Sequence, residues 1–343
     1  MGKWHLGANL TPHPGFRYWI TMVHGHTTEF YGLPIIEDGR VRDEPGYATD
    51  LWTEHAVRFI RQNKERPFFL YLAYNGPYGL GTLLRNPARN RHADYYADKP
   101  LLSFPRGAPH PWLFNNKEYL NNPVAIRRVA AETSGVDDGV GTVLQTLHEA
   151  GLDERTLVVY TADQGWIGGH NGLWGMGDHT RPLGAFDGMM HVPLIFRQPR
   201  TIAPGAASDL LVSHYDFLPT VLSYLGLGGV PAAARPPSPG RDYSGVLRGR
   251  AVPWESIVFY EMETTRAIRT ADWKYVHRPD GPFELYDLQL DPHEKFNLFG
   301  QPPLAQTQAE LSQRLQAFFD RTAEPKYDLY RGGTSKASLL SRR

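Results

Sequence analysis

The feature that most constrains the fold is a unit of one amphipathic helix and one apolar strand, which occurs twice in the chain. In residues 49–65 apolar side chains recur at helical spacing, and the run PFFLYLAY follows from Pro67. In the second unit, apolar residues repeat at helical spacing from Val129 to Leu147, and TLVVYTA follows after Gly151. Alternating helices and buried strands predict an α/β protein with a mainly parallel sheet flanked by helices.

A change of composition divides the chain into parts. We predict a first domain over 1–228 and a linker rich in Gly, Pro and Ala over 229–253. Short strand-like runs and a final amphipathic helix predict a small α+β subdomain over 254–323. Residues 324–343 are polar and end in basic residues, which predicts a flexible tail.

Composition excludes several classes of function. Lys plus Arg equal Asp plus Glu at 36 each, so no overall basic field favours nucleic acid. The chain has no cysteine, which excludes disulfides, thiolate zinc sites and a cysteine nucleophile within it. The longest apolar runs are far shorter than the ~20 residues that span a bilayer. No export signal is encoded in the chain as given, so its localisation is unknown.

Polar residues follow the second apolar strand, where ligands bind in parallel sheets. Asp163 and Gln164 come directly after TLVVYTA and open a long loop rich in Gly, His and Trp. Their side chains supply the hard oxygen donors that Ca²⁺ or Mg²⁺ prefers. The alternative is that Asp163 caps a turn and Gln164 is solvated.

Two further segments carry candidate site residues. Tyr78 follows the first apolar strand, where a Gly-Pro turn with a half-buried tyrosine is the alternative. Lys3 and His5 alternate along a possible strand end, which places both on one face. A cation beside a proton donor suits an oxyanion substrate, although two exposed polar residues at a chain end would show the same pattern. His179 is a ligand, an acid or only a polar loop residue.

Several segments together resemble the sulfatase family of the alkaline-phosphatase superfamily. They occur in the family's order: GKWHLG at 2–7, PFFLYLAYNGPY at 67–78, Asp-Asp-Gly-Val-Gly at 137–141 and TLVVYTADQG at 156–165. The carboxy-terminal segments RAIRTADWKY and ELYDLQLDPHEKFNL resemble the family's carboxy-terminal subdomain. Four matches in order make chance agreement improbable, and the resemblance covers almost the whole chain.

This resemblance implies hydrolysis of a sulfate ester at a Ca²⁺-type (or Mg²⁺) site, with a formylglycine nucleophile made from cysteine or serine. Asp163 and Gln164 would then be metal ligands, and Lys3 would hold the sulfate. His5 would orient the nucleophile or exchange protons with it. The expected partner is a sulfated small molecule or glycan, and the segments 79–123 and 166–185 are the candidate loops for its organic part.

The chain departs from the family pattern at three places. Tyr78 stands where the family usually has a histidine, and Met176 stands where it usually has an anion-binding lysine. His179 and Arg181 are our candidates to replace that lysine in substrate binding. The nucleophile motif, Cys or Ser followed by x-Pro-x-Arg, is absent; the segment 103–106 (SFPR) is one residue too short and lies on the wrong side of GKWHLG.

We therefore expect a sulfatase-family chain without the amino-terminal segment that carries the nucleophile and paired metal-binding aspartates. Such a chain is expected to be inactive alone. Two alternatives stay open at this point: a phosphodiesterase or phosphonate hydrolase of the same superfamily, and a non-catalytic protein that binds sulfated glycans.

Overall fold

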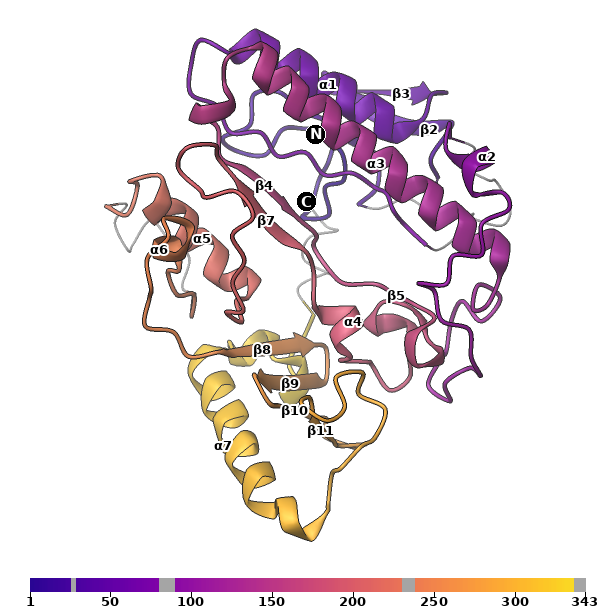
Figure 1. Cartoon of the computed structure of the whole chain (residues 1–343), viewed down its shortest axis with the longest axis vertical. Helices are drawn as coiled ribbons and strands as arrows, with labels where there is room; N and C mark the ends of the chain where they lie inside the picture. The colour runs from indigo at the N-terminus through magenta and orange to yellow at the C-terminus, as the bar shows by residue number, and fades with distance from the viewer. Residues whose placement is uncertain (26–28, 80–89, 230–237, 336–343) are drawn as a thin grey trace.

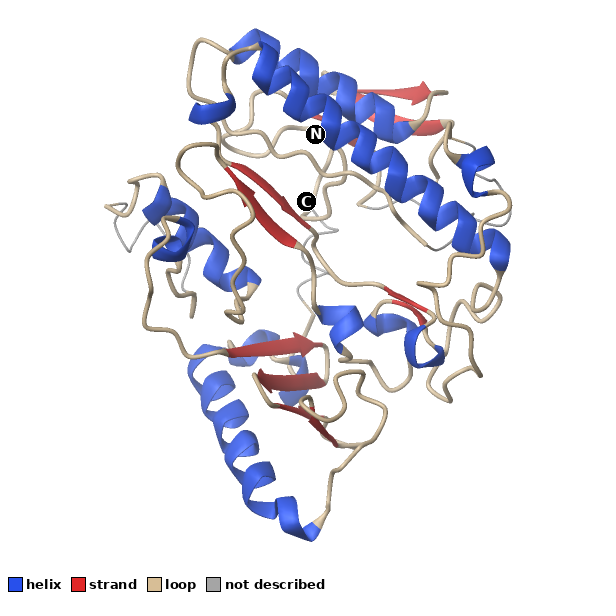
Figure 2. Cartoon of the chain, viewed as in Figure 1, coloured by secondary structure: helices blue, strands red, loops and turns tan. Residues whose placement is uncertain are grey.

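The computed structural model describes residues 1–25, 29–79, 90–229 and 238–335. Parts of the predicted linker, of the predicted tail and of the candidate loop 79–123 thus lie outside the described residues. Figure 1 shows β2 and β3 with α1 and α3 in one region, the pair β4 and β7 in the middle, and β8–β11 with α7 at the carboxy-terminal end. Figure 2 shows helices together with strands in the first and the last of these regions.

The strands are β1 (Ile20–Met22), β2 (Leu33–Glu37), β3 (Arg40–Glu44), β4 (Val158–Thr161), β5 (Ile167–Gly168), β6 (Trp174–Gly175), β7 (Leu194–Arg197), β8 (Ile257–Met262), β9 (Thr265–Thr270), β10 (Trp273–His277) and β11 (Glu284–Asp287). The α-helices are α1 (Ala48–Asn63), α2 (Ala93–Tyr96), α3 (Pro123–Glu149), α4 (Asp187–Met190), α5 (His214–Tyr224), α6 (Ser244–Leu247) and α7 (Ala305–Thr322). Short 3₁₀ helices are η2 (Asp153–Arg155), η3 (His170–Gly172), η4 (Gly177–His179), η6 (Pro302–Leu304), η7 (Pro325–Tyr327) and η8 (Leu329–Arg331).

The two long helices form where the apolar spacing predicted them. α1 buries Trp52, Ala56 and Ile60 on one face, as expected of an amphipathic helix. α3 begins earlier than its apolar pattern does, because the Asn122 side chain caps it by accepting the N–H groups of Val124 and Ala125. α1 and α3 lie side by side in Figure 1. In the described part of the chain, no helix combines the length and the apolar composition that a membrane span needs.

The strand pairing differs from the mainly parallel sheet that we predicted. Every pairing between named strands in the described residues is antiparallel, in the orders β1-β2-β3, β4-β7, β5-β6 and β11-β10-β9-β8. Among the residues that the structure describes, parallel pairing is limited to single bridges of Gly2 with Thr21 and Ala73. β4 and β7 are joined by a long connection that contains two very short strands and short helices, without the long helix of a parallel crossover.

The predicted buried strand PFFLYLAY is extended but largely unpaired. In the described part of the chain, its main chain forms hydrogen bonds with the first residues: Met1 donates to the carbonyl of Tyr71 at 2.7 Å, and Lys3 donates to that of Ala73 at 2.8 Å. Phe69 is 74% exposed and Tyr71 is 45% exposed. The segment therefore has the apolar composition of a core strand, while one of its faces is open.

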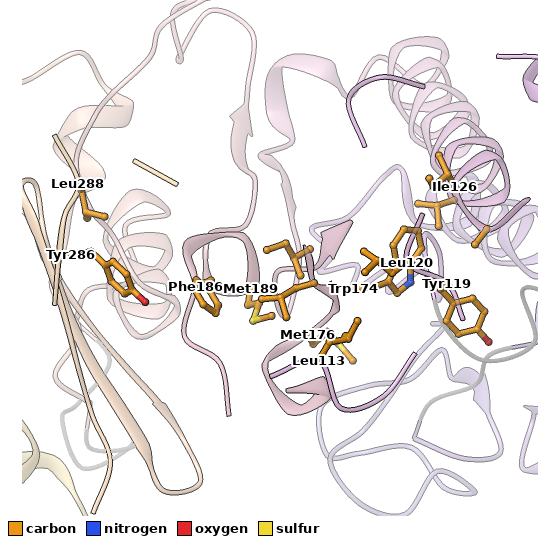
Figure 3. Packing of buried hydrophobic residues seen from close by; sticks show 14 residues of the cluster. Leu113, Tyr119, Leu120, Ile126, Trp174, Met176, Phe186, Met189, Tyr286 and Leu288 are labelled. Carbon is orange, nitrogen blue, oxygen red and sulfur yellow. The ribbon is translucent and has the colours of Figure 1, made fainter. Parts of the chain in front are cut away.

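The largest apolar cluster contains residues of α3, of β11 and of the long loop that follows β4 (Figure 3). Trp174 and Phe186 lie near its centre, and Ile126 of α3 and Tyr286 of β11 lie toward its two sides. Met176 belongs to the same cluster and is only 7% exposed. The loop after β4 is thus part of the core, although it contains little regular structure.

Buried charges connect the carboxy-terminal sheet to the rest of the chain. Lys274 of β10 is fully buried, forms ion pairs with Asp187 and Glu294, and donates to the carbonyl of Ala185 at 3.0 Å. These contacts hold the start of α4 against β10. Arg266 of β9 similarly pairs at 2.7 Å with the buried Asp328.

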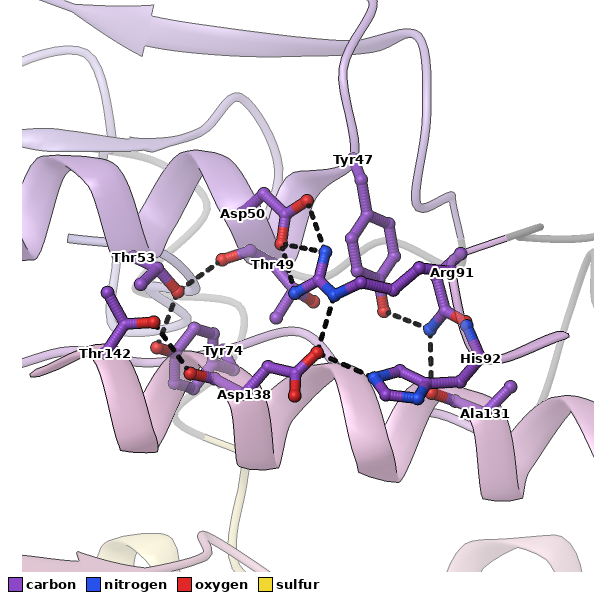
Figure 4. Close-up of polar contacts among 11 residues, drawn as sticks. Tyr47, Thr49, Asp50, Thr53, Tyr74, Arg91, His92, Ala131, Asp138 and Thr142 are labelled. Carbon is purple, nitrogen blue, oxygen red and sulfur yellow. Dashed lines mark hydrogen bonds and ion pairs between the residues drawn. The ribbon is translucent and has the colours of Figure 1, made fainter. Parts of the chain in front are cut away.

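An exposed polar cluster joins α1, α3 and the segment before α2 (Figure 4). Asp138, from the Asp-Asp-Gly segment of α3, accepts from Arg91 and pairs with His92, both at 2.6 Å. Arg91 also pairs with Asp50 of α1 at 3.1 Å. Asp138 therefore fastens residues 91–92 to α3, and Asp50 fastens Arg91 to α1.

Candidate active site

The centre of the candidate site is the contact between Lys3 and Asp163, which are far apart in sequence. The Lys3 ammonium lies 2.6 Å from the Asp163 carboxylate, and the side chains are 21% and 62% exposed, respectively. Gly2 brings Lys3 there, because its main chain lies so close to Ala73 that a Cβ atom would stand 1.9 Å from the Ala73 carbonyl oxygen. Asp163 arrives from the other side, two residues after β4.

Gln164 points toward Met176, the residue that stands where the family usually has a lysine. Its side-chain amide contacts the sulfur of Met176. Met176 is held in turn by the apolar cluster, and its main-chain N–H donates to His179 Nδ1 at 3.0 Å. Position 176 is therefore a core position in this chain, and it presents no charge to an anion.

Tyr78 approaches the same region from the loop after PFFLYLAY. Its main-chain N–H donates to the carboxyl of Glu132 at 3.3 Å. Burial raises the pKa of the Tyr78 phenol, and the nearby charges of Asp178 and Asp163 raise it further. The phenol thus lies within electrostatic reach of Asp163 and keeps its proton at neutral pH.

His179 and Arg181 stand in a separate arrangement around η4. Burial lowers the pKa of His179, although Asp178 at 3.3 Å acts in the opposite direction. Arg181 stacks on Phe114, 4.8 Å from the ring centre, and donates to the carbonyls of Asp178 and Thr180. In the described residues the contacts of Arg181 are with this neighbourhood, and none joins it to Lys3 or Asp163.

His5 and its neighbour Trp4 lie in different environments. The imidazole of His5 lies against Gly25, where an added Cβ would stand 2.0 Å from its ring. Trp4 packs among aromatic rings, with centroids 5.4 Å from Trp19 and 6.1 Å from Tyr71. The segment 2–7 therefore places an aromatic anchor between the two polar candidates.

The segment SFPR has a structural role, in agreement with its departure from the nucleophile motif. Phe104 packs against the large apolar cluster. Arg106 donates to the main-chain carbonyls of Pro100, Leu101 and Phe104.

The sequence did not single out Asp178 or Glu132. Asp178 raises the pKa of Tyr78 from the short helix η4, which no periodicity marks in the sequence. Glu132 is fully buried on α3. The available signal was a lone glutamate among apolar and small residues of the predicted helix, which is unusual for a buried face.

The described residues fit a metal only in part. Asp163 and Gln164 present adjacent oxygen donors, but no group of three or more His, Asp or Glu side chains in the described ranges gathers into a cation site. Ca²⁺ takes six to eight oxygen ligands. The Lys3 ammonium also pairs with the Asp163 carboxylate, to which a metal cation would bind. These residues alone therefore do not complete a metal shell, and we derive no reaction step through one.

Two family models match the chain. The sulfatase model matches residues 1–227, and the model for the carboxy-terminal part of N-sulphoglucosamine sulphohydrolase matches residues 184–321. The chain is also similar to the N-acetylglucosamine-6-O-sulfatase of Bacteroides thetaiotaomicron, with 26% identity over 92% of this chain and 69% of that protein. It spans between 47% and 64% of the length of seven other curated relatives.

Solved structures share the fold. A sulfatase from Bacteroides fragilis has a TM-score of 0.74 and 22% identity, with 91% of this chain and 67% of that chain covered. A protein solved in complex with its substrate, D-glucosamine-2-N,6-O-disulfate, has a TM-score of 0.69 and 24% identity, with 93% and 78% covered. These likenesses confirm the predicted alkaline-phosphatase-like α/β fold class. By the match of its family model over residues 1–227, the chain belongs to the sulfatase family.

Proposed function

We propose that this chain belongs to a hydrolase of sulfate esters on carbohydrate and holds the sulfate group with Lys3. The observation that carries the proposal is the 2.6 Å contact between Lys3 and Asp163. It joins the family's GKWHLG segment to its metal-binding segment across 160 residues of sequence. The main chain of Lys3 is held by Ala73, so its ammonium is positioned before a ligand arrives. A positioned ammonium is suited to bind an oxyanion and to stabilise the negative charge that develops on the oxyanion.

The side chains near Lys3 have different proposed roles in proton transfer. Tyr78 keeps its proton at neutral pH, so it is a hydrogen-bond donor to the leaving oxygen in place of the family histidine. His179, whose pKa burial lowers, offers an uncharged imidazole whose Nδ1 accepts the main-chain N–H of Met176. We assign to His5 the orientation of, or proton exchange with, the nucleophile. His179 and Arg181 are proposed to bind the substrate in place of the family lysine at position 176.

The cofactor is part of the same proposal. Asp163 and Gln164 would be two oxygen ligands of a Ca²⁺ or Mg²⁺ ion, which would supply positive charge to the sulfate oxygens. The remaining ligands and the formylglycine nucleophile are not among the residues of this chain. We therefore propose that the chain as given binds a sulfate group but does not turn it over alone.

The class of substrate is supported by the relatives. One relative acts on N-acetylglucosamine 6-O-sulfate by its name, and one solved structure contains a disulfated glucosamine. We propose a sulfated amino sugar of a glycan as the substrate class. The two sulfatase-type family models favour sulfate esters over the phosphodiester or phosphonate reaction.

The test measures binding and turnover of N-acetylglucosamine 6-sulfate with the purified 343-residue chain. We expect weak binding that Lys3→Met removes and that Lys64→Met, at an exposed position next to the end of α1, leaves unchanged. Equal binding by wild type and Lys3→Met would refute the assignment of Lys3. Turnover that Asp163→Ala abolishes would refute the proposal that the chain is inactive alone.

The same binding measurement, repeated with a sulfated oligosaccharide, separates a non-catalytic glycan-binding protein, which the departures at Tyr78 and Met176 favour. Such a protein would bind a sulfated oligosaccharide much more tightly than the monosaccharide, because several sugar units would contact it. A part of a hydrolytic site would show a similar affinity for both ligands.

A further inference from the structure

A buried carboxyl lies against the candidate-site loop that carries Tyr78. Glu132 of α3 has no exposed surface, and its neighbours Ala131 and Gly135 on the helix are buried as well. Glutamate is almost never fully buried unless it is paired. Neither the apolar packing of α3 nor the proposed roles of the other site residues account for it.

The carboxyl is poorly compensated for its burial. Its Oε2 accepts the main-chain N–H of Tyr78 at 3.3 Å, and its Oε1 has no hydrogen-bond partner within the described ranges. One long hydrogen bond offsets little of the cost of removing a carboxylate from water. Burial accordingly raises the pKa of Glu132 to about 8, while the Tyr78 N–H and Arg128 lower it by less.

Three buried anchors hold the loop of residues 75–79. The Asn75 side chain accepts from Trp52 Nε1 and donates to the carbonyl of Glu29, both at 3.1 Å. The carbonyl of Gly79 accepts from Trp174 Nε1 at 2.7 Å. Glu132 is the third anchor. Amide and indole groups keep the same charge at all ordinary pH values, so Glu132 is the anchor that titrates.

The groups that face Glu132 come from three elements. Arg128 lies one turn earlier on α3 and stays charged throughout. The phenol of Tyr47, at the start of α1, has a pKa of about 12. Tyr78 has a pKa above its usual value of 10 and is influenced by Asp163 and Asp178. A proton exchanged near pH 8 in this group therefore belongs to Glu132 rather than to either phenol.

We propose that Glu132 is a positioning residue for Tyr78, and that gain or loss of its proton changes the placement of the Tyr78 phenol in the candidate site. A carboxylate accepts a hydrogen bond about twice as strong as a neutral acceptor does, so ionisation tightens the hold on the Tyr78 N–H. The inference rests on the proposed function, because it takes Tyr78 as a residue that faces the sulfate ester.

The experiment follows Glu132 and Tyr78 separately by NMR in the full chain between pH 6 and 10. We expect the side-chain carboxyl ¹³C signal of Glu132 and the amide ¹⁵N signal of Tyr78 to titrate together, with a midpoint at about 8. Glu132→Gln should remove the Tyr78 transition. Glu149→Gln, at an exposed position of the same helix, should leave it in place.

A Tyr78 signal that still titrates in Glu132→Gln, or one that stays flat while Glu132 titrates, would overturn the inference. Should Glu132→Gln not fold, the wild-type comparison decides: coincident transitions support the coupling, and separate ones overturn it. Sulfate added to the same sample tests the proposed function independently, through the amide signals of Lys3 and Asp163. Failure of those signals to shift would contradict sulfate binding and leave the coupling of Glu132 to Tyr78 intact.

Discussion

The ammonium of Lys3 lies 2.6 Å from the carboxylate of Asp163, so the two central charges of the candidate site neutralise each other. Lys3 is fixed by main-chain pairing with Ala73, and Asp163 by its place after β4. An anion that approaches Lys3 therefore meets the negative charge of Asp163 at the same time. Coulomb repulsion at this short range opposes sulfate binding.

Removing that negative charge should strengthen sulfate binding. We expect Asp163→Asn to lower the dissociation constant for inorganic sulfate several-fold, because Lys3 keeps its place and loses its counter-charge. The measurement is a calorimetric titration at low ionic strength with a metal chelator present, since salt screens exposed pairs. Asp209→Asn, at an exposed position, is the control. Unchanged or weaker binding by Asp163→Asn would show that Lys3 does not receive the anion.

A divalent cation should have a similar effect on the unmodified chain. Ca²⁺ bound by the Asp163 carboxylate would replace Lys3 as its partner and leave the ammonium free for sulfate. We expect added Ca²⁺ to raise the sulfate affinity of the wild type several-fold and to have little effect on Asp163→Asn. The same titration checks this with and without the chelator. An equal gain for both proteins would place the cation elsewhere.

The buried ion cluster at β10 should be a main contributor to stability. Lys274→Met would remove the cation that pairs with the buried Glu294, and it would leave Asp187 with the more distant Arg269, at 3.4 Å. Removing one partner of a buried ion pair typically costs about 3–5 kcal/mol. We expect a loss of that size in the free energy of unfolding, measured with urea. Lys295→Met, at an exposed position, should stay within about 0.5 kcal/mol of wild type.

Helices were predictable because their evidence is local. The apolar spacing of residues 49–65 gives the buried face of α1 directly, and only the capped start of α3 at Asn122 extended beyond its pattern. Strand pairing was not predictable, because the composition of an apolar run does not identify the strand with which it pairs. TLVVYTA and PFFLYLAY have the composition of core strands, yet β4 pairs antiparallel with β7 and Phe69 is exposed.

The site was predictable only through the resemblance. No spacing in the sequence connects Lys3 to Asp163, whose contact depends on the tertiary arrangement of the first residues beside Ala73. Arg181 was a candidate because it lies five residues after Met176 in the sequence. Its guanidinium stacks on Phe114, so proximity in sequence did not predict its contacts. Glu132 is 54 residues from Tyr78, so only the packed structure reveals their hydrogen bond.

The buried carboxyl of Glu132 should make the chain less stable as pH rises. Its folded-state pKa is about 8, against 4.5 for the free side chain. Between these values the folded chain holds one proton more than the unfolded chain does. The free energy of unfolding therefore decreases with pH in this window, by roughly 1.4 kcal/mol per pH unit for a single group. The contribution is fully present below about pH 4 and is lost by about pH 8.

Glu132→Gln removes this pH dependence while it keeps the size of the side chain. We expect the variant to gain stability relative to wild type steadily between pH 5.5 and pH 7.5, measured by urea unfolding at each pH. Glu149→Gln should follow the wild-type curve, because its exposed side chain loses no hydration on folding. A constant difference between Glu132→Gln and wild type across this range would mean that Glu132 is ionised in the folded chain. The raised pKa, and the titrating anchor inferred from it, would then both be wrong.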